Sequence, residues 1–428
     1  MKALIASTPA QGHLTPLLAV ANILIKHNHE VIVQTAPELR SMVEAAGVSF
    51  MPELPDTNSF NDLMAFLELP ERQTKNPDLE MVVFDMEYYF SQKIGGQAAG
   101  LKQALRDFPA DVILTDVTFF GTLPLLLGQR KKRPAIVHLG ISLLNLFSAK
   151  NSPPRPGMTQ QEQLAKRERR DEVYHKPTKA MVDQVLAELG CPPLPLPPLE
   201  SMVALPDLYL QPGIESFQYA EDASLPSHIH YVGLLPLPPS QHPLPDWWHK
   251  LDKTKRLVLV TQGTIANRDL GQVIGPALTG LAAQEDVIVL ATTAGQPLES
   301  ILSEIPANAH VTSFLPYELI LPNVDLLITN GGYGTVSLAI AHGIPIVSAG
   351  MTEDKEEVSA HVQWAGVGID LRTNQATAES IRTAAREVLD NPVYRERAKQ
   401  LAQEFASHNT EIEVLRLIEA CVSEPLIV

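Results

Sequence analysis

Apolar runs alternate with amphipathic stretches over the first 140 residues of the chain. Residues 2–7 form a short apolar run that predicts a strand. The stretch after it is predicted to be a helix from apolar residues at helical spacing: Leu14, Leu17, Leu18, Ala21, Leu24 and Ile25. Further strands are predicted at 30–35, 111–116 and 135–140, with a helix at 37–46 that starts at a proline. Strands that alternate with helices in this way predict a parallel sheet covered on both faces.

The same alternation restarts in the second half of the chain. Strands are predicted at 256–261, 286–292, 310–314, 324–329, 344–348 and 367–371, and helices near 377–390, 392–406 and 410–422. Two earlier stretches, 52–100 and 150–210, show weak periodicity, and we expect irregular insertions there that either contact ligands or form plain surface loops. A Pro-rich run at 233–252 is predicted to be a semi-rigid linker.

These elements predict an α/β protein with two Rossmann-like, doubly wound parallel-sheet domains facing each other across a cleft. We expect an N-terminal domain at 1–232, the linker at 233–252, a second domain at 253–405 and a final segment at 406–428. The cleft between two such domains is the default ligand site.

Charge and composition narrow the possible partners. The 428 residues include 49 acidic and 33 basic side chains, so nucleic acid and anionic membranes are poor partners. No stretch approaches the roughly 20 apolar residues of a membrane helix, and the N-terminus is interpreted as a strand, not a signal peptide. Cys191 and Cys421 form no motif and are either reduced thiols or a disulfide. The low cysteine count favours the cytoplasm.

A histidine and an aspartate are the candidate catalytic residues. His13 lies in the loop Thr8–Pro16, which connects the first strand to the first helix, and Asp116 ends the strand at 111–116. Both positions are at the carboxyl edge of the predicted sheet, where a histidine can take a proton and a carboxylate can orient it. Each residue has a plainer alternative, because either side chain could simply cap a helix.

A second candidate site is glycine-rich. The segment Thr329–Thr335 (TNGGYGT) follows a predicted strand and precedes a helix, and Thr261-Gln-Gly-Thr264 repeats the arrangement at the first strand of that domain. Glycines allow close approach, and a helix N-terminus offers free N–H groups to a diphosphate. The alternative is a tight turn. There is no lysine of the Walker type.

These motifs resemble those of the inverting, two-domain nucleotide-sugar glycosyltransferases, family 1 of the GT-B fold. The opening TPAQGHLTPLLAVANIL and the donor signature TNGGYGT with LAIAHGIPIVSAG carry the resemblance. It implies metal-independent transfer by direct displacement, with His13 as the base and Asp116 orienting it. It implies no cofactor beyond the nucleotide sugar, and a last helix that packs back on the N-terminal domain. The donor residues it implies are Gly12, Thr261, Gly263, Thr264, Phe314, Leu315, Gly331, Gly332, Gly334 and Thr335, with Phe314 stacking on the base.

The donor signature also departs from the family pattern. Asn330 stands where a phosphate-binding histidine is usual, and Leu338 where a ribose-binding glutamate is usual. Glu353, Asp354 and Lys355 stand where an Asp-Gln pair contacts the sugar. UDP-glucose is the first expectation for the donor and a deoxythymidine-diphosphate sugar the second.

The acceptor is expected to be a small lipophilic alcohol or phenol. The candidate contacts are Phe84, Tyr88, Phe119, Phe120 and Leu143. The same segments contain further aromatic and apolar residues, which are Phe66, Met86, Tyr89, Phe90 and Phe147. Each of these side chains is, taken singly, more often ordinary core.

The function predicted is therefore an inverting hexosyltransferase, active as a monomer or homodimer. Three alternatives stay open: a sugar-nucleotide epimerase or lipid-linked glycosyltransferase of the same fold, a non-catalytic binding scaffold, and a dinucleotide oxidoreductase. The last is the weakest, because the first loop lacks G-x-G-x-x-G and the second strand ends in Gln34-Thr35.

Overall fold

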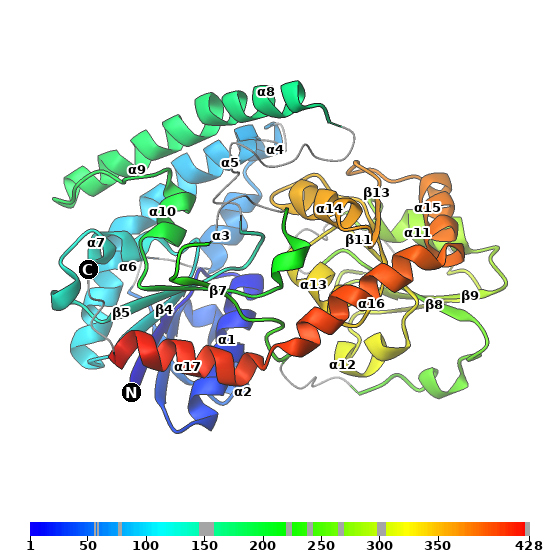
Figure 1. Cartoon of the computed structure of the whole chain (residues 1–428), viewed down its shortest axis with the longest axis horizontal. Coiled ribbons are helices and arrows are strands. Elements are labelled where there is room, and N and C mark those ends of the chain that lie inside the picture. Colours follow the sequence, from blue (N-terminus) through cyan, green and yellow to red (C-terminus); the bar gives the residue numbers. More distant parts are fainter. Residues whose placement is uncertain are drawn as a thin grey trace.

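Two parallel sheets, each with helices on both faces, make up the computed structural model of the chain (Figure 1). It describes residues 1–54, 57, 60–75, 79–144, 158–219, 225–237, 243–263, 269–297 and 305–423. Among these, no helix is both long and apolar enough to span a membrane. Both cysteines are free thiols, each partly buried.

The first sheet has seven strands in the order β3-β2-β1-β4-β5-β6-β7. The strands are β1 Lys2–Ala6, β2 Glu30–Thr35, β3 Ser49–Pro52, β4 Val112–Asp116, β5 Ala135–Leu139, β6 Leu208–Gln211 and β7 Ile229–Tyr231. The helices of this half are α1 Gln11–Lys26, α2 Arg40–Ala45, α3 Phe60–Leu67, α4 Pro70–Gln73, α5 Leu79–Asp85, α6 Ser91–Asp107, α7 Leu123–Leu126, α8 Gln160–Arg170, α9 Lys176–Glu188 and α10 Pro198–Ala204.

The second sheet has six strands in the order β10-β9-β8-β11-β12-β13. The strands are β8 Arg256–Thr261, β9 Val287–Thr292, β10 Ala309–Thr312, β11 Leu326–Thr329, β12 Ile346–Ser348 and β13 Gly368–Asp370. The helices are α11 Ile274–Leu281, α12 Tyr317–Ile320, α13 Tyr333–Ala341, α14 Lys355–Trp364, α15 Ala378–Asp390, α16 Pro392–Ser407 and α17 Thr410–Ser423. The predicted strands are therefore present in both halves, with bounds that differ by a few residues.

Each sheet separates two cores because side chains alternate along a strand. In β1, Ala3 and Ile5 pack on the face covered by α1, whereas Leu4 and Ala6 pack on the opposite face with α6. The second sheet is likewise buried on both faces. The two-domain α/β fold class predicted from the sequence is confirmed.

The prediction of irregular structure at 52–100 and 150–210 was wrong. Most described residues there are helical, and α5 and α6 join through a π-helical turn, η2 Met86–Phe90. A second π turn, η5 Asp171–His175, joins α8 to α9, which lie along the outer edge of the first half (Figure 1). A π turn inserts an extra residue per turn, so the apolar stripe shifts sideways and the 3.6-residue period is lost across the join.

The chain crosses between the two halves at two neighbouring places. Gly213 and Gly233 form an isolated antiparallel bridge at the end of the first half. Trp247, in the Pro-rich segment, stacks on His310 with ring centroids 4.4 Å apart. The segment around Trp247 therefore packs on the second half. After α16 the chain returns, and α17 lies against α1 (Figure 1), with Glu411 bonded to Lys26 and His27.

Candidate active site

The strand order of each sheet reverses at one point, between β1 and β4 in the first and between β8 and β11 in the second. At such a switch point the loops after the two strands diverge to opposite faces and leave room for a ligand at the carboxyl edge. The segment after β1, which leads into α1, contains His13, and β4 ends at Asp116, while the loops after β8 and β11 are the two Gly-rich segments. All four predicted motifs therefore lie at switch points.

His13 and Asp116, 103 residues apart in sequence, are hydrogen-bonded in the structure. The Nδ1 atom of His13 lies 3.0 Å from Oδ1 of Asp116. Asp116 is completely buried, whereas the His13 side chain keeps 21% of its surface exposed. His13 lies in the first turn of α1, which begins at Gln11, so the ring sits at the edge of the sheet.

Two threonines that the sequence analysis did not single out hold Asp116 in place. Thr8 donates its backbone N–H to Oδ2 of Asp116 at 2.8 Å and its hydroxyl to Oδ1 at 3.1 Å. Thr118 donates its backbone N–H to Oδ1 at 3.0 Å and its hydroxyl at 2.6 Å. A threonine in a loop has no sequence pattern that marks it as a hydrogen-bond partner. The one available signal was that Thr118 follows Asp116 by two residues, and it was not used.

The environment of Asp116 keeps its carboxylate ionised. Burial alone would raise the pKa of Asp116, but the charge of His13 and hydrogen bonds from His13, Thr118 and Thr8 outweigh burial and lower the pKa to about 2. An ionised Asp116 accepts the proton on Nδ1 of His13, which leaves Nε2 with the free lone pair. Among the described residues, none is hydrogen-bonded to that Nε2 atom.

The loops after β8 and β11 are tied together by Asn330. Its Nδ2 atom donates to the backbone oxygen of Gln262 at 2.6 Å. Asn330 is buried, so the residue that replaces the family's histidine joins two loops of the fold. Thr261 ends β8 and lies under the same loops, where its hydroxyl accepts from Thr292 at 3.1 Å. Thr264 lies outside the described residues.

The glycines of these loops differ in what surrounds them. A side chain at Gly331, whose φ is +88°, would lie 2.6 Å from Oγ of Ser359, so the fold requires this glycine. Gly332 and Gly334, like Gly12 in the first domain, have no atom within 4 Å of where a Cβ would stand. Gly332 precedes α13 without a side-chain cap, and Thr335 is in the first turn of the helix. There is thus free space beside the start of α13, where a helix has N–H groups without partners in the helix.

The nucleotide-side candidates have unequal exposure. Phe314 is 44% exposed, and its ring edge lies against Gly295. Leu315 is buried in the core next to α13, and so is Leu338 on that helix. The side chain of Leu338 therefore points into the core, and the usual ribose contact at this position is replaced by packing.

The three residues before and at the start of α14 form an ion-paired group. Lys355 Nζ bonds to Glu353, whose φ of +51° is rare for a residue with a side chain. Asp354 accepts a 2.5 Å hydrogen bond from Ser142, which follows β5 in the other domain. Burial raises the pKa of Asp354, against the charge of Lys355 and the bond from Ser142.

The acceptor candidates divide into surface and core side chains. Tyr88 is 55% exposed and packs on Phe84, with ring centroids 4.5 Å apart. Phe119 is buried in a core next to the first sheet, Phe120 is buried among the helices outside it, and Leu143 is buried against the second domain. The plainer interpretation as core therefore applies to these last three. Phe147 lies outside the described residues.

A chain of aromatic contacts connects Tyr88 and Phe84 to the residues just before α1. Phe84 stacks on Phe66, which contacts Tyr89 at 5.1 Å between centroids. Ala10, three residues before His13, packs in the same cluster. A buried aromatic cluster therefore lies beside the segment that contains His13.

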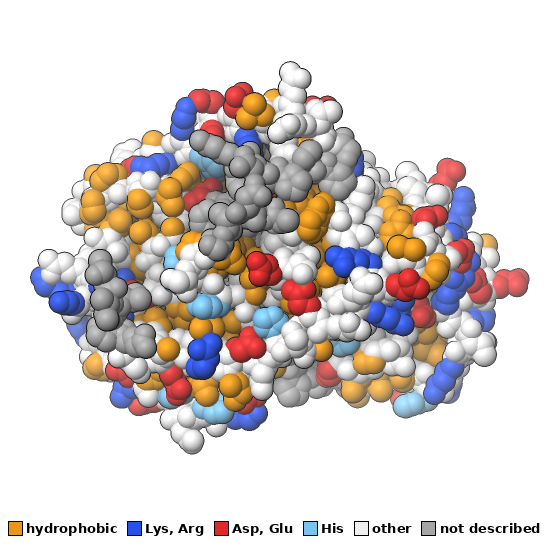
Figure 2. All heavy atoms as spheres, viewed as in Figure 1, with side chains coloured by type: hydrophobic (Ala, Val, Ile, Leu, Met, Phe, Trp, Pro, Cys, Tyr) orange, Lys and Arg blue, Asp and Glu red, His pale blue; other side chains and the backbone are white. Residues whose placement is uncertain are grey.

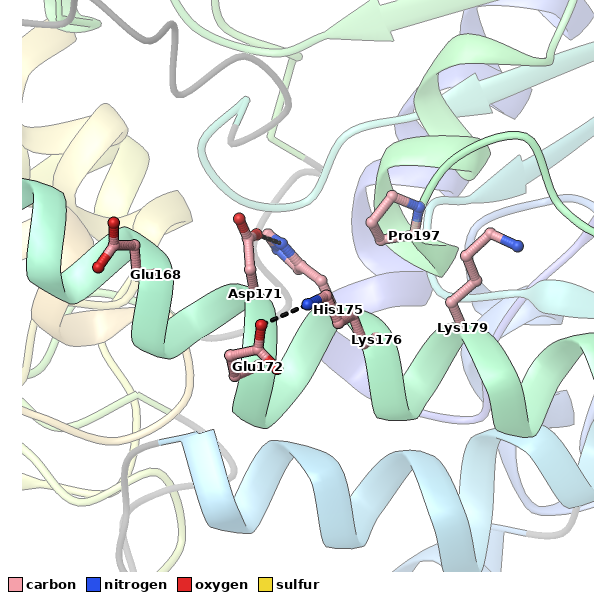
Figure 3. A pocket seen from close by; sticks show the side chains of 7 residues that line it. All are labelled: Glu168, Asp171, Glu172, His175, Lys176, Lys179 and Pro197. Carbon is pink, nitrogen blue, oxygen red and sulfur yellow. Dashed lines mark hydrogen bonds and ion pairs between the residues drawn. The ribbon is translucent and has the colours of Figure 1, made fainter.

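A hollow of about 310 Å³ lies elsewhere, on the outer helices α8 and α9 (Figure 3). His175 is placed there between Asp171, at 2.6 Å, and Glu200, at 3.0 Å. The other lining residues are mostly charged and include Lys176 and Lys179. It contains none of the residues singled out from the sequence. Throughout the described part of the chain, no three His, Cys, Asp or Glu side chains are grouped as metal ligands would be.

Charge on the molecular surface is mixed. On the face shown in Figure 2, acidic and basic side chains are interspersed with hydrophobic ones. The side chains coloured in that view form no extended basic area of the kind that nucleic-acid binding uses.

The arrangement of two such sheets with switch-point loops is that of the GT-B glycosyltransferases. A solved structure, the glycotransferase of kitacinnamycin, superposes with a TM-score of 0.77 at 20% identity and covers 98% of this chain and 99% of its own. This similarity establishes the fold.

Sequence comparison establishes the family. The model of the erythromycin biosynthesis protein CIII-like C-terminal domain matches residues 277–421. The 4'-demethylrebeccamycin synthase of Lentzea aerocolonigenes is 35% identical over 98% of this chain and 99% of its own length. UDP-glycosyltransferase 2 of Phaeomoniella chlamydospora is 33% identical over 94% and 91%. The chain belongs to the family 1 glycosyltransferases.

Family membership confirms the resemblance on which the functional prediction was based. The protein is a glycosyltransferase, so the oxidoreductase, epimerase and scaffold alternatives lose their support. Its relatives over the full length include enzymes named for UDP-sugar transfer. The donor sugar, the acceptor and the role of each site residue are proposals.

Proposed function

We propose that this glycosyltransferase moves a hexose from a nucleotide-diphosphate sugar to a hydroxyl of a small lipophilic acceptor, with inversion at the anomeric carbon. The observation that carries this proposal is the hydrogen bond from His13 to the buried Asp116 at the switch point of the first sheet. This pair fixes the Nδ1 nitrogen of the ring and leaves Nε2 to accept a proton.

In the proposed step, Nε2 of His13 takes the proton of the acceptor hydroxyl as its oxygen bonds to the anomeric carbon. The bond from that carbon to the diphosphate oxygen breaks, and the nucleoside diphosphate leaves. Asp116 stabilises the imidazolium that forms, as a carboxylate does in other histidine-based dyads. The leaving diphosphate gains negative charge, and in this proposal the N-terminal N–H groups of α13 stabilise it.

UDP-glucose is the donor we propose first. Support comes from the exposed ring of Phe314, which offers a flat face for a pyrimidine, and from a relative named as a UDP-glycosyltransferase. A deoxythymidine-diphosphate sugar is the alternative, because Asn330 and Leu338 leave the nucleotide fewer side-chain contacts than is usual in the family.

The acceptor we propose is a flat aromatic or apolar molecule with a free hydroxyl. Its support is the chain of aromatic contacts from Tyr88 and Phe84 to Phe66, which packs with Ala10 just before α1 and His13. Aromatic rings favour such ligands through offset stacking and burial of apolar area.

His13→Ala tests the proposal. We expect kcat for an alcohol acceptor to fall by about 10²–10⁴-fold, the usual contribution of a general base, while UDP affinity by calorimetry is unchanged. A phenol that is already ionised at high pH should recover part of the lost rate, because it no longer needs a base. The donor is identified beforehand by screening nucleotide sugars against a phenol and alcohol library and detecting the mass increase.

His249→Ala is the matched control, since His249 is exposed and lies outside both loops. It should transfer sugar at the wild-type rate. Full activity of purified, folded His13→Ala on alcohols would show that His13 is not the base.

A further inference from the structure

Gln211 lies at the centre of a buried polar cluster between the two domains. It is the last residue of β6, at the carboxyl edge of the first sheet, and it is completely buried. Its Nε2 atom is 2.9 Å from the backbone oxygen of Ser142 and 3.1 Å from the hydroxyl of Tyr333. This side chain therefore bonds to both domains at once.

Tyr333 belongs to the Gly-rich segment Thr329–Thr335 of the second domain, and its hydroxyl lies in this cluster. It is the first residue of α13, between Gly332 and Gly334, and its ring is buried in the second core. Its hydroxyl donates to the backbone oxygen of Pro212 at 2.5 Å. Burial raises the pKa of this phenol to about 12, so the hydroxyl remains a donor at neutral pH.

Two glycines make room for these contacts. A Cβ at Gly213, whose φ is +125°, would lie 2.4 Å from the Tyr333 hydroxyl. A Cβ at Gly140 would lie 2.5 Å from Oε1 of Gln211. The backbone is therefore shaped around this pair of side chains.

The cluster also contacts the start of α14 and lies near the end of β4, where Asp116 is. Ser142, whose backbone accepts from Gln211, donates its hydroxyl to Asp354 at the start of α14. Asp116 pairs in register with Leu139 of β5, three residues before Ser142. Hydrogen bonds therefore link the end of β6, the segment after β5 and the starts of α13 and α14, and β4 lies beside them through its pairing with β5.

We propose that Gln211 and Tyr333 are positioning residues, which set the distance between the base at His13 and the anomeric carbon of a donor held at α13. This inference rests on the proposed function. A direct displacement requires the attacking oxygen close to and in line with the anomeric carbon, and a misplacement of about 1 Å can cost about 10²-fold in rate. The base and the donor loop belong to different domains, so a contact between the domains must fix this distance.

Tyr333→Phe removes only the hydroxyl and leaves the ring in its core. We expect kcat for transfer from UDP-glucose to 2-naphthol to fall roughly tenfold, because the donor is less well aligned. UDP affinity should change less than about twofold, because backbone N–H groups bind the diphosphate. A larger share of UDP-glucose should be hydrolysed instead of transferred. Gln211→Met should behave alike, and the double variant should be no worse than either single variant.

Tyr394→Phe is the control, because Tyr394 packs in the other core of the second domain, and it should leave kcat unchanged. The inference is overturned if Tyr333→Phe keeps the wild-type kcat, or if UDP affinity falls as far as kcat, since Tyr333 would then belong to the phosphate site. If the wild-type protein itself neither binds UDP nor transfers any sugar, the proposed function fails. The contact between Gln211 and Tyr333 is then tested by thermal unfolding. If the losses of stability in the two single variants add up in the double variant, the two side chains are not coupled and the inference is refuted.

Discussion

At the scale of single residues, Asp116 is placed so that both of its oxygens accept hydrogen bonds. Oδ2 faces the backbone N–H of Thr8, and Oδ1 faces His13 and Thr118. An asparagine in this place would point its NH₂ group at one of these donors in either orientation. The site therefore requires two acceptor oxygens, which a carboxylate has and an amide does not.

We predict that Asp116→Asn lowers kcat by about 10²–10⁴-fold and also destabilises the protein. The pKa of Asp116, about 2 against 3.8 for an ordinary aspartate, corresponds to about 2 kcal/mol of stability. Because the folded-state pKa is the lower one, this stability is complete above about pH 4 and is lost as the pH falls toward 2. Urea unfolding at pH 7 and at pH 3 should therefore show a gap between wild type and variant that narrows at the lower pH.

Asp246→Asn, at an exposed position, should show no such gap at either pH. A gap that stays constant down to pH 2 would mean that the carboxylate of Asp116 is not stabilised by its partners.

The sequence indicated the two principal residues of this site but not their supports. His13 and Asp116 were predicted because each follows an apolar run that reads clearly as a strand, and parallel strands bring their carboxyl ends together. Thr8, Thr118 and Gln211 were missed, because a polar residue near a strand end is common and only the fold decides what it touches. Phe119 shows the reverse case, an aromatic residue next to Asp116 whose ring is core.

At the scale of elements, the start of α13 shows two adjacent glycines with different roles. Gly331 has a left-handed backbone and a crowded Cβ position against Ser359. Gly332 has an ordinary φ of −63° and open space around it. The fold therefore depends on Gly331, whereas a bound diphosphate would occupy the space beside Gly332.

We predict that Gly331→Ala and Gly332→Ala separate stability from donor binding. Gly331→Ala should lower the free energy of unfolding by about 1–3 kcal/mol, because alanine is strained at positive φ and meets Ser359. Gly332→Ala should change stability by less than about 1 kcal/mol but weaken UDP binding about tenfold. Thermal unfolding and calorimetry on both variants test this, and equal UDP affinity in wild type and Gly332→Ala would contradict the placement of the diphosphate.

The helices on either side of a π turn were not predicted, whereas α1, α15, α16 and α17 were. Helix α8 is strongly polar and is joined to α9 through η5, and α5 is joined to α6 through η2. Each π turn moves the buried stripe by one position, so neither helical pair shows one continuous period. The short strands β3, β6 and β7 were not predicted either, whereas the other strands of the two sheets have no such interruption and were predicted from their apolar runs.

At the scale of the whole molecule, the chain closes on itself through α17. After α16 of the second domain, the chain turns at His408 beside Gly233, and α17 packs in the core of the first domain. Val414, Leu417 and Ile418 are its buried side chains there. The first domain is thus completed by the last helix of the chain, although the residues in between form the second domain.

Ile418→Ala should therefore destabilise the first domain, on which α17 packs, and not the second domain, which precedes α17 in the sequence. Ile418 is completely buried against α1, so its truncation should cost about 2–5 kcal/mol. Leu401→Ala on α16 is the matched variant, because Leu401 is equally buried but lies in a core of the second domain. Hydrogen exchange read by mass spectrometry should show lost protection in β1 and β4 for Ile418→Ala and in β8 and β11 for Leu401→Ala, because each sheet depends on its own core. If Ile418→Ala lowered protection equally in both sheets, the two domains would unfold as one cooperative unit, and the buried contacts between them, with Gln211 and Tyr333 at their centre, would be as strong as a core.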